Sequence, residues 1–181
     1  DSVDITNKWK DVSLNNQTQI DNLITTDVDD LIKVNAIADF IRNQNFKNKE
    51  ELDKYYKLAL KTASRIPLKE KKESTILYLD FRYSTKLMWM GYNEQGIEIL
   101  ETITQNSKSS NNPEFYVRAH SAIAHQFLQS GDLTQATNRL QAVLNEKESL
   151  DKKLKALLLI QLGNINRTQG LNEKAISYLD T

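Results

Sequence analysis

The sequence predicts an all-α fold, a right-handed α-solenoid of antiparallel helix pairs with repeats of about 40 residues. Gly91, Gly131 and Gly170 are each followed five residues later by a small residue, and four residues after that by Leu. The pattern recurs after 40 and then 39 residues, a period typical of stacked helical repeats. Only 2 Pro and 5 Gly occur in 181 residues, too few for a turn-rich β fold. The small residues are Gly96, Ala136 and Ala175, and the leucines are Leu100, Leu140 and Leu179.

The N-terminal part of the chain is expected to hold a helical lead-in and one degenerate repeat. Thr26 and Asp29 indicate a helix start, because apolar residues recur at helical spacing after them. Pro67 closes the second helix of this repeat. The predicted segments are a lead-in over 1–28 with helices at 1–12 and 16–25, and a repeat over 29–68 whose second helix spans 49–64.

Three further repeats complete what we expect to be a single domain. Pro113 suits the first turn of a helix. Asp132 with Gln135 forms a capping box, and Ser149 and Asn172 are predicted caps of later helices. The repeats are predicted over 69–112, 113–149 and 150–181, the last one truncated, with helices at 70–90, 93–105, 113–130 and 150–169.

Each recurring turn has a consistent physical explanation. Gly at the end of a first helix adopts the left-handed conformation that reverses the chain. The small residue that follows lets the second helix approach the first closely, and the Leu fills the space one turn further on. The alternative is a helical bundle whose turns happen to share Gly, which would require three coincident patterns at one period.

The pattern around Leu162, Gly163, Gly170, Ala175 and Leu179 resembles a tetratricopeptide (TPR) repeat. The resemblance covers about 29–181 and is strong over 77–181. The family's early aromatic residue is replaced here by Asp80, His120 and Leu159, and the closing Pro is missing at the expected place. Longer repeats of this kind are similar to the TPR input regions of bacterial sensor kinases and transcription regulators. The same frame fits Ile123, Ala124, Phe127, Gly131, Ala136, Leu140 and Val143, and more loosely Tyr83, Ser84, Leu87, Gly91, Gly96, Leu100 and Ile103.

Composition argues against several classes of function. Lys plus Arg and Asp plus Glu both total 24, so the chain has no basic excess with which to neutralise nucleic-acid phosphates. The basic run from Lys69 to Lys72 is short and is interrupted by Glu70. The absence of Cys excludes disulfides and thiolate metal sites. No stretch is long and apolar enough to insert into a bilayer.

The two histidines do not indicate a metal site. His120 and His125 are five residues apart, about 140° around a helix axis, so they cannot share a metal ion as a same-face pair would. We expect His120 to be a partly buried side chain with satisfied hydrogen bonds. No phosphate-binding loop or nucleophile motif is present. We therefore expect no catalytic residue, no metal and no cofactor.

The TPR resemblance implies a ligand groove lined by one face of each first helix. That face mixes aromatic, amide and Arg side chains, which suits an extended peptide or a partner helix. Some TPR proteins clamp the C-terminal carboxylate of their ligand with convergent Lys and Asn residues, and this face lacks such a set. The implied groove residues are Tyr78, Phe81, Arg82, Thr85, Arg118, Ser121, His125, Gln161 and Asn164, with Leu157 and Ile160 beside them.

Met88, Trp89 and Met90 form a bulky cluster at the end of a predicted helix. One interpretation is a hydrophobic anchor for a bound peptide. The interpretation we favour from the sequence is packing between repeats.

The sequence predicts a non-enzymatic protein- or peptide-binding module, the sensory or scaffolding part of a larger bacterial signal-transduction or transcription regulator. A stand-alone periplasmic or lipoprotein scaffold in envelope assembly is the alternative, and an enzyme with an unfamiliar helical site is a third. Lys outnumbers Arg by 18 to 6, as in AT-rich bacterial genomes. The sequence is compatible with a cytoplasmic or a periplasmic location and slightly favours the exported, periplasmic one.

The C-terminal end of the sequence suggests a solenoid that continues. Thr181 falls early in the second helix of the last repeat, and Ile160, Ile176 and Leu179 have no following helix to cover them. We expect the native protein to continue with at least one more helix. We also expect this segment to self-associate through its C-terminal face.

Overall fold

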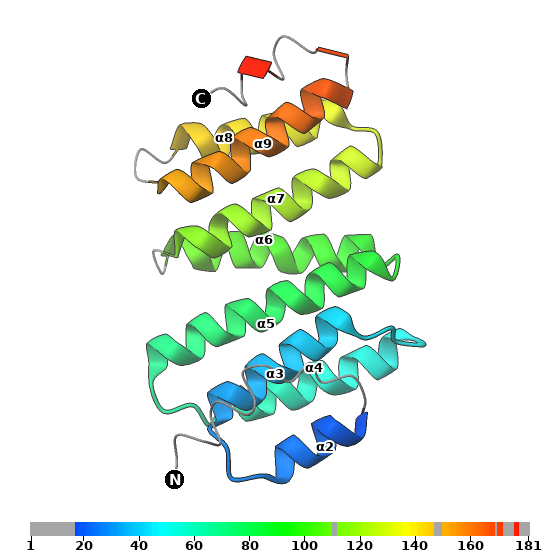
Figure 1. The fold of residues 1–181 in the computed structure, drawn as a ribbon, viewed down its shortest axis with the longest axis vertical. Helices are drawn as coiled ribbons and strands as arrows, with labels where there is room; N and C mark the ends of the chain where they lie inside the picture. Colours follow the sequence, from blue (N-terminus) through cyan, green and yellow to red (C-terminus); the bar gives the residue numbers. More distant parts are fainter. Residues whose placement is uncertain (1–16, 110–111, 147–149, 169, 172–175, 178–181) are drawn as a thin grey trace. The chain divides into compact units, whose positions relative to one another are not determined.

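The computed structural model describes residues 17–109, 112–146, 150–168, 170–171 and 176–177, and within these ranges the regular structure is helical with no strand (Figure 1). This confirms the all-α prediction, whereas the solenoid arrangement of the pairs stays a prediction. The helices are α2 (Gln17–Thr25), α3 (Asp30–Asn43), α4 (Lys49–Ala63), α5 (Lys69–Trp89), α6 (Asn93–Ser109), α7 (Pro113–Gln129), α8 (Leu133–Glu146) and α9 (Lys152–Thr168).

The chain divides into two compact units, residues 1–99 and 100–181, and the boundary falls within α6. The first unit holds α2 to α5 and the start of α6. The second holds the rest of α6 and α7 to α9. The single domain predicted over 1–181 stays a prediction.

The core of the first unit forms where α3 packs against α4 and α5, with α2 against α3 (Figure 1). It contains an aromatic group: the ring centroids of Phe40 and Tyr55 lie 4.9 Å apart, and Phe46 lies 5.9 Å from Phe40 and 5.8 Å from Tyr55. Aliphatic side chains share this core and remove their apolar surface from water. The fully buried aliphatic residues include Ile20, Leu23, Ile37, Ile41, Leu52 and Leu79.

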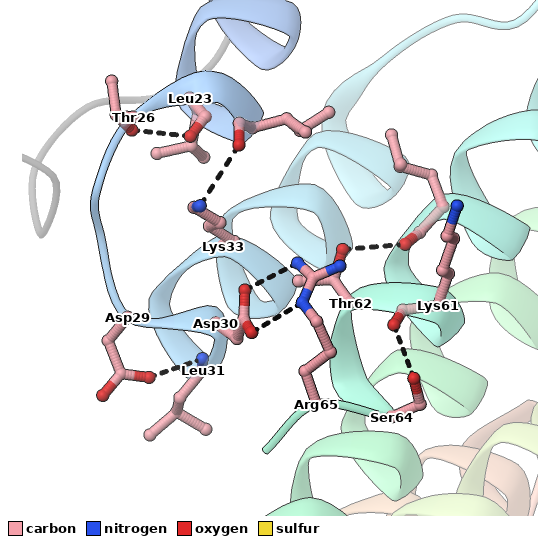
Figure 2. Close-up of polar contacts among 12 residues, drawn as sticks. Leu23, Thr26, Asp29, Asp30, Leu31, Lys33, Lys61, Thr62, Ser64 and Arg65 are labelled. Atoms are coloured by element: carbon pink, nitrogen blue, oxygen red, sulfur yellow. Dashed lines mark hydrogen bonds and ion pairs between the residues drawn. The ribbon is translucent and has the colours of Figure 1, made fainter.

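Polar contacts fix the ends of α2, α3 and α4 (Figure 2). Asp29 caps α3 by accepting a hydrogen bond from the Leu31 backbone N–H at 2.8 Å, whereas the sequence pattern places the helix start at Thr26 with Asp29. Thr26 instead belongs to the end of α2, since its hydroxyl donates to the Leu23 carbonyl at 2.6 Å. Arg65, just after α4, donates to both carboxylate oxygens of Asp30 at 2.9 and 2.7 Å, which lowers the pKa of Asp30. These contacts fix how the chain enters α3 and leaves α4.

The core of the second unit forms where α7 packs against α8 and α9, and α8 against α9 (Figure 1). Asn112 caps α7 through the Phe115 N–H at 3.4 Å, and Pro113 begins the helix, as predicted. Asp132 accepts from the Gln135 N–H at 3.0 Å, the predicted cap. The fully buried core residues include Val117, Ala136, Leu140, Val143, Leu158 and Leu162.

The start of α9 differs from the sequence prediction. The helix begins at Lys152 rather than at 150, and its cap is Asp151, whose carboxylate accepts from the Leu154 N–H at 2.8 Å. Leu150, placed before this cap, is buried in the core of the unit. The predicted caps Ser149 and Asn172 lie outside the described residues.

The three predicted glycine turns share one backbone conformation. Gly91, Gly131 and Gly170 have φ of 92°, 84° and 73°. In each, the glycine N–H bonds the carbonyl three residues back, and the next residue's N–H bonds the carbonyl five residues back, at 2.9–3.2 Å. This is the Schellman arrangement, in which a left-handed residue satisfies the last carbonyls of a helix. The prediction that these glycines adopt the left-handed conformation is confirmed.

The segments that follow two of these turns also share their burial. Positions 91–103 and 131–143 match position for position in whether the residue is buried, half-buried or exposed. Gly96 and Ala136 are buried, as the close approach of two helices requires. A Cβ added at Gly96 would lie 2.8 Å from the Ser84 carbonyl oxygen, so at this position even Ala is too large. The third copy, with Ala175 and Leu179, lies outside the described residues.

Candidate protein-binding site

A pocket of about 480 Å³ opens between α7 and α9 in the second unit. Two charged residues of α7 line one side of it, and the first three turns of α9 with the preceding cap line the other. This α7/α9 groove is formed by Glu114, Arg118, Asp151, Lys153, Leu154, Ala156, Leu157 and Ile160.

The floor of the α7/α9 groove is apolar. Ile160 is 49 % exposed and is among the few large apolar side chains left open to solvent. Ala156 is exposed and Leu157 is half-buried, whereas Leu154 is buried in the core below. An apolar floor with a few polar groups at its rim is the usual composition of a binding pocket.

The rim of the α7/α9 groove is charged. Arg118 donates to Glu114 at 2.9 Å from Nε and lies 2.8 Å from it through Nη2. Both side chains are well exposed, and an exposed pair of this spacing on one helix is worth only about 0.3–0.5 kcal/mol. Arg118 can therefore turn toward a ligand at little cost in free energy.

The structure brings only some of the predicted groove residues of the second unit to this site. Arg118 lines the α7/α9 groove, together with Leu157 and Ile160. Asn164 and His125 are exposed elsewhere on α9 and α7, and the His125 ring bonds the Gln129 amide at 3.0 Å.

Two other predicted residues of this unit lie further inside. Ser121 is only 6 % exposed and its hydroxyl has no hydrogen-bond partner within the described residues. Gln161 is half-buried, and its carbonyl oxygen is buried and also unpartnered there.

The predicted groove residues of the first unit form a cluster of their own on α5. Tyr78 donates to Asp39 on α3 at 2.5 Å, and Arg82 donates to the Tyr78 hydroxyl at 3.1 Å with its guanidinium 4.8 Å from the ring centre. Phe81 and Thr85 are half-buried, and the Thr85 hydroxyl donates to the Phe81 carbonyl at 2.9 Å. The Arg82 side chain is only 18 % exposed, so internal contacts occupy much of it.

His120 corrects one expectation. It is half-buried, as expected, but its Nδ1 is buried without a hydrogen-bond partner in the described part of the chain. Burial, helped by nearby Arg139, lowers the pKa of His120 to about 4. The ring instead packs edge-on against Tyr116, with centroids 4.6 Å apart. A helical wheel places the residue correctly but cannot show whether a neighbouring helix supplies a partner.

The position of Trp89 also differs from what the sequence predicts. Trp89 is 68 % exposed, which contradicts packing between repeats for this residue, although Met90 does pack against the core of the first unit. The Lys86 ammonium lies 4.7 Å from the Trp89 ring centre and donates to the Gln44 carbonyl at 2.8 Å. Trp89 lies two residues before the turn glycine Gly91. At the other two glycine turns the equivalent residues are Gln129 and Thr168, and both are exposed. The repeat therefore does not require an aromatic residue at this position.

No helix in the described ranges is both long and apolar enough to cross a bilayer. Among the same residues, no group of three or more His, Cys, Asp or Glu could hold a metal ion. The chain matches no protein-family model, no curated protein and no solved structure.

Proposed function

We propose that this chain is a non-enzymatic protein-interaction module, built as a TPR-like right-handed α-solenoid, that binds a protein or peptide ligand. Three Schellman turns at a period of about 40 residues support the repeat. The matching burial of 91–103 and 131–143 supports it further. Repeats of this type stack through neighbouring helices and use the extended surface that results for binding.

The observation that carries the proposed function is the α7/α9 groove. Its exposed Ile160 and its charged rim at Arg118 and Lys153 offer apolar contact together with directional polar contact. A partner helix or an extended peptide uses this combination, with apolar anchors for affinity and polar groups for register. We place the module in the sensory or scaffolding part of a larger bacterial regulator.

A quantitative pull-down with the purified chain tests the proposal. Ile160→Asp places a charge on the groove floor, and Ala142→Asp makes a matched change at an exposed position on α8. Partners that the parent chain and Ala142→Asp retain should be lost with Ile160→Asp, while circular dichroism shows all three chains equally helical. Equal retention by the two variants, or no retained protein at all, contradicts the proposal.

A further inference from the structure

The exposed surface of α9 combines an apolar centre with basic ends. Ala156 and Ile160 are open to solvent in the middle of the helix, Lys152 and Lys153 are exposed at its start, and Arg167 is exposed at its end. We propose that this α9 face (Lys152, Lys153, Ala156, Ile160, Arg167) binds an acidic amphipathic helix of a partner protein. The inference rests on the proposed function and adds the chemistry of the partner.

The charge of α9 sets it apart from the rest of the chain. Four basic and no acidic residues occur in its 17 positions, although the whole chain has a net charge of +0. None of the four forms an ion pair with another described residue. The nearest acidic residue in sequence, Asp151, already caps the helix through the Leu154 N–H. The basic residues of the α9 face therefore have no ion-pair partner among the described residues.

The apolar centre of the α9 face corresponds to a surface that the chain itself covers one repeat earlier. With the 39-residue offset between Gly131 and Gly170, Ala156 and Ile160 are equivalent to Val117 and Ser121 on α7. Those two are buried, and Val117 shares a core with Leu158 of α9. Thus the two equivalent positions are buried on α7 and open to solvent on α9. A helix laid over Ala156 and Ile160 would bury them as their equivalents on α7 are buried.

The sequence predicts self-association through the C-terminal end, including Ile160, but the charges on α9 make a second copy of the chain a poor occupant. Lys153 and Arg167 are each seven residues from Ile160, so two antiparallel α9 helices crossing at Ile160 would set Lys153 of one copy against Arg167 of the other. Parallel helices would set like residues against each other. Either arrangement opposes charges of the same sign in an interface that excludes water.

An acidic amphipathic helix would match both the apolar centre and the basic ends of the α9 face. Fourteen residues separate Lys153 from Arg167, which is about 21 Å along the helix axis. The partner helix therefore needs carboxylates about four turns apart with apolar side chains between them. Nucleic acid would pair with the basic ends but would leave Ile160 without an apolar partner.

The probe is a fluorescent synthetic helix of about 18 residues, with Leu on one face and Glu near both ends, titrated by anisotropy. A second peptide carries Gln for every Glu, and a third carries Lys. We expect the Glu peptide to bind at least about tenfold more tightly than the Gln peptide near 0.1 M salt. Lys153→Glu/Arg167→Glu should remove that advantage and transfer it to the Lys peptide.

The matched control is Lys61→Glu/Lys71→Glu, which changes the net charge equally at exposed positions of α4 and α5. Loss of binding in this control as large as in the α9 variant would show non-specific attraction and overturn the inference. So would self-association that Ile160→Asp abolishes, or binding of a short RNA or of phosphatidylserine vesicles where the Glu peptide does not bind. If pull-down partners depend on Ile160 but not on Lys153 and Arg167, the inference fails and the proposed function stands.

Discussion

Tyr56 on α4 and Tyr83 on α5 stack face to face, with ring centroids 3.9 Å apart and planes 7° from parallel. The Tyr56 hydroxyl donates to Asp80 at 2.7 Å and the Tyr83 hydroxyl donates to Asp53 at 2.5 Å. On each helix the Asp precedes the Tyr by three residues. Each helix thus supplies one donor and one acceptor, and the reciprocal pair joins α4 to α5 within the first unit.

The two hydrogen bonds of this pair should differ in their contribution to stability. Asp80 is the more buried carboxylate, and burial raises its pKa although the Tyr56 hydroxyl opposes this. Asp53 also pairs with Lys49 at 2.7 Å. Tyr56→Phe should therefore cost about 1–3 kcal/mol in the free energy of urea unfolding, and Tyr83→Phe about 0.5–1.5 kcal/mol. A larger loss for Tyr83→Phe would contradict this account.

The glycine turns should depend on backbone conformation rather than on space. A Cβ added at Gly131 would meet nothing within 4 Å, but its φ of 84° is unfavourable for any L side chain. Gly131→Ala should lower the free energy of unfolding by about 1–2 kcal/mol. Ser130→Ala, at a residue with φ of −78°, should change it less. Equal effects of the two substitutions would argue against the Schellman turn.

Close packing of α8 should show as intolerance of a larger side chain at Ala136, which is fully buried as predicted. Ala136→Leu forces extra volume into this contact and should destabilise the chain by about 1–3 kcal/mol. Ala142→Leu makes the same change at an exposed position of the same helix and serves as the control. If thermal melting shows both variants to be as stable as the parent, the close approach at Ala136 is wrong.

His120 should make the fold sensitive to acid. Its pKa is lowered to about 4 in the folded chain, against about 6.5 when unfolded. Between these values the unfolded chain binds more protons, so stability present above about pH 6.5 is lost as the pH falls toward 4. Because solvent reaches part of the ring and screens its charge, the loss should be on the order of 1–2 kcal/mol. Urea unfolding across this range should show a shallower pH dependence for His120→Gln. A slope for His120→Gln equal to that of the parent would contradict this account.

Local rules predicted what depends on neighbours along the chain. Gly131 reverses the chain because its own φ must be positive, and Asp132 caps α8 because its side chain reaches an N–H three residues away. Contacts between helices were harder to predict, because they depend on how far each helix is rotated about its axis. The spacing of Asp80 and Tyr56 gives no sign that they meet, and nothing local shows that Lys86 on α5 reaches the Gln44 carbonyl at the end of α3.

The measurement that tests the solenoid most directly is a set of distances between equivalent positions on the first helices of three successive repeats. Thr85, His125 and Asn164 are separated by 40 and 39 residues, and the chain has no Cys, so pairs of introduced Cys can be spin-labelled specifically. The pair His125 and Asn164 lies within the second unit and gives the reference distance. The proposed solenoid predicts a narrow distribution for Thr85 and His125 that matches this reference, and a distance close to twice as long for Thr85 and Asn164. A broad distribution for Thr85 and His125, or a clearly longer distance than the reference, would contradict it.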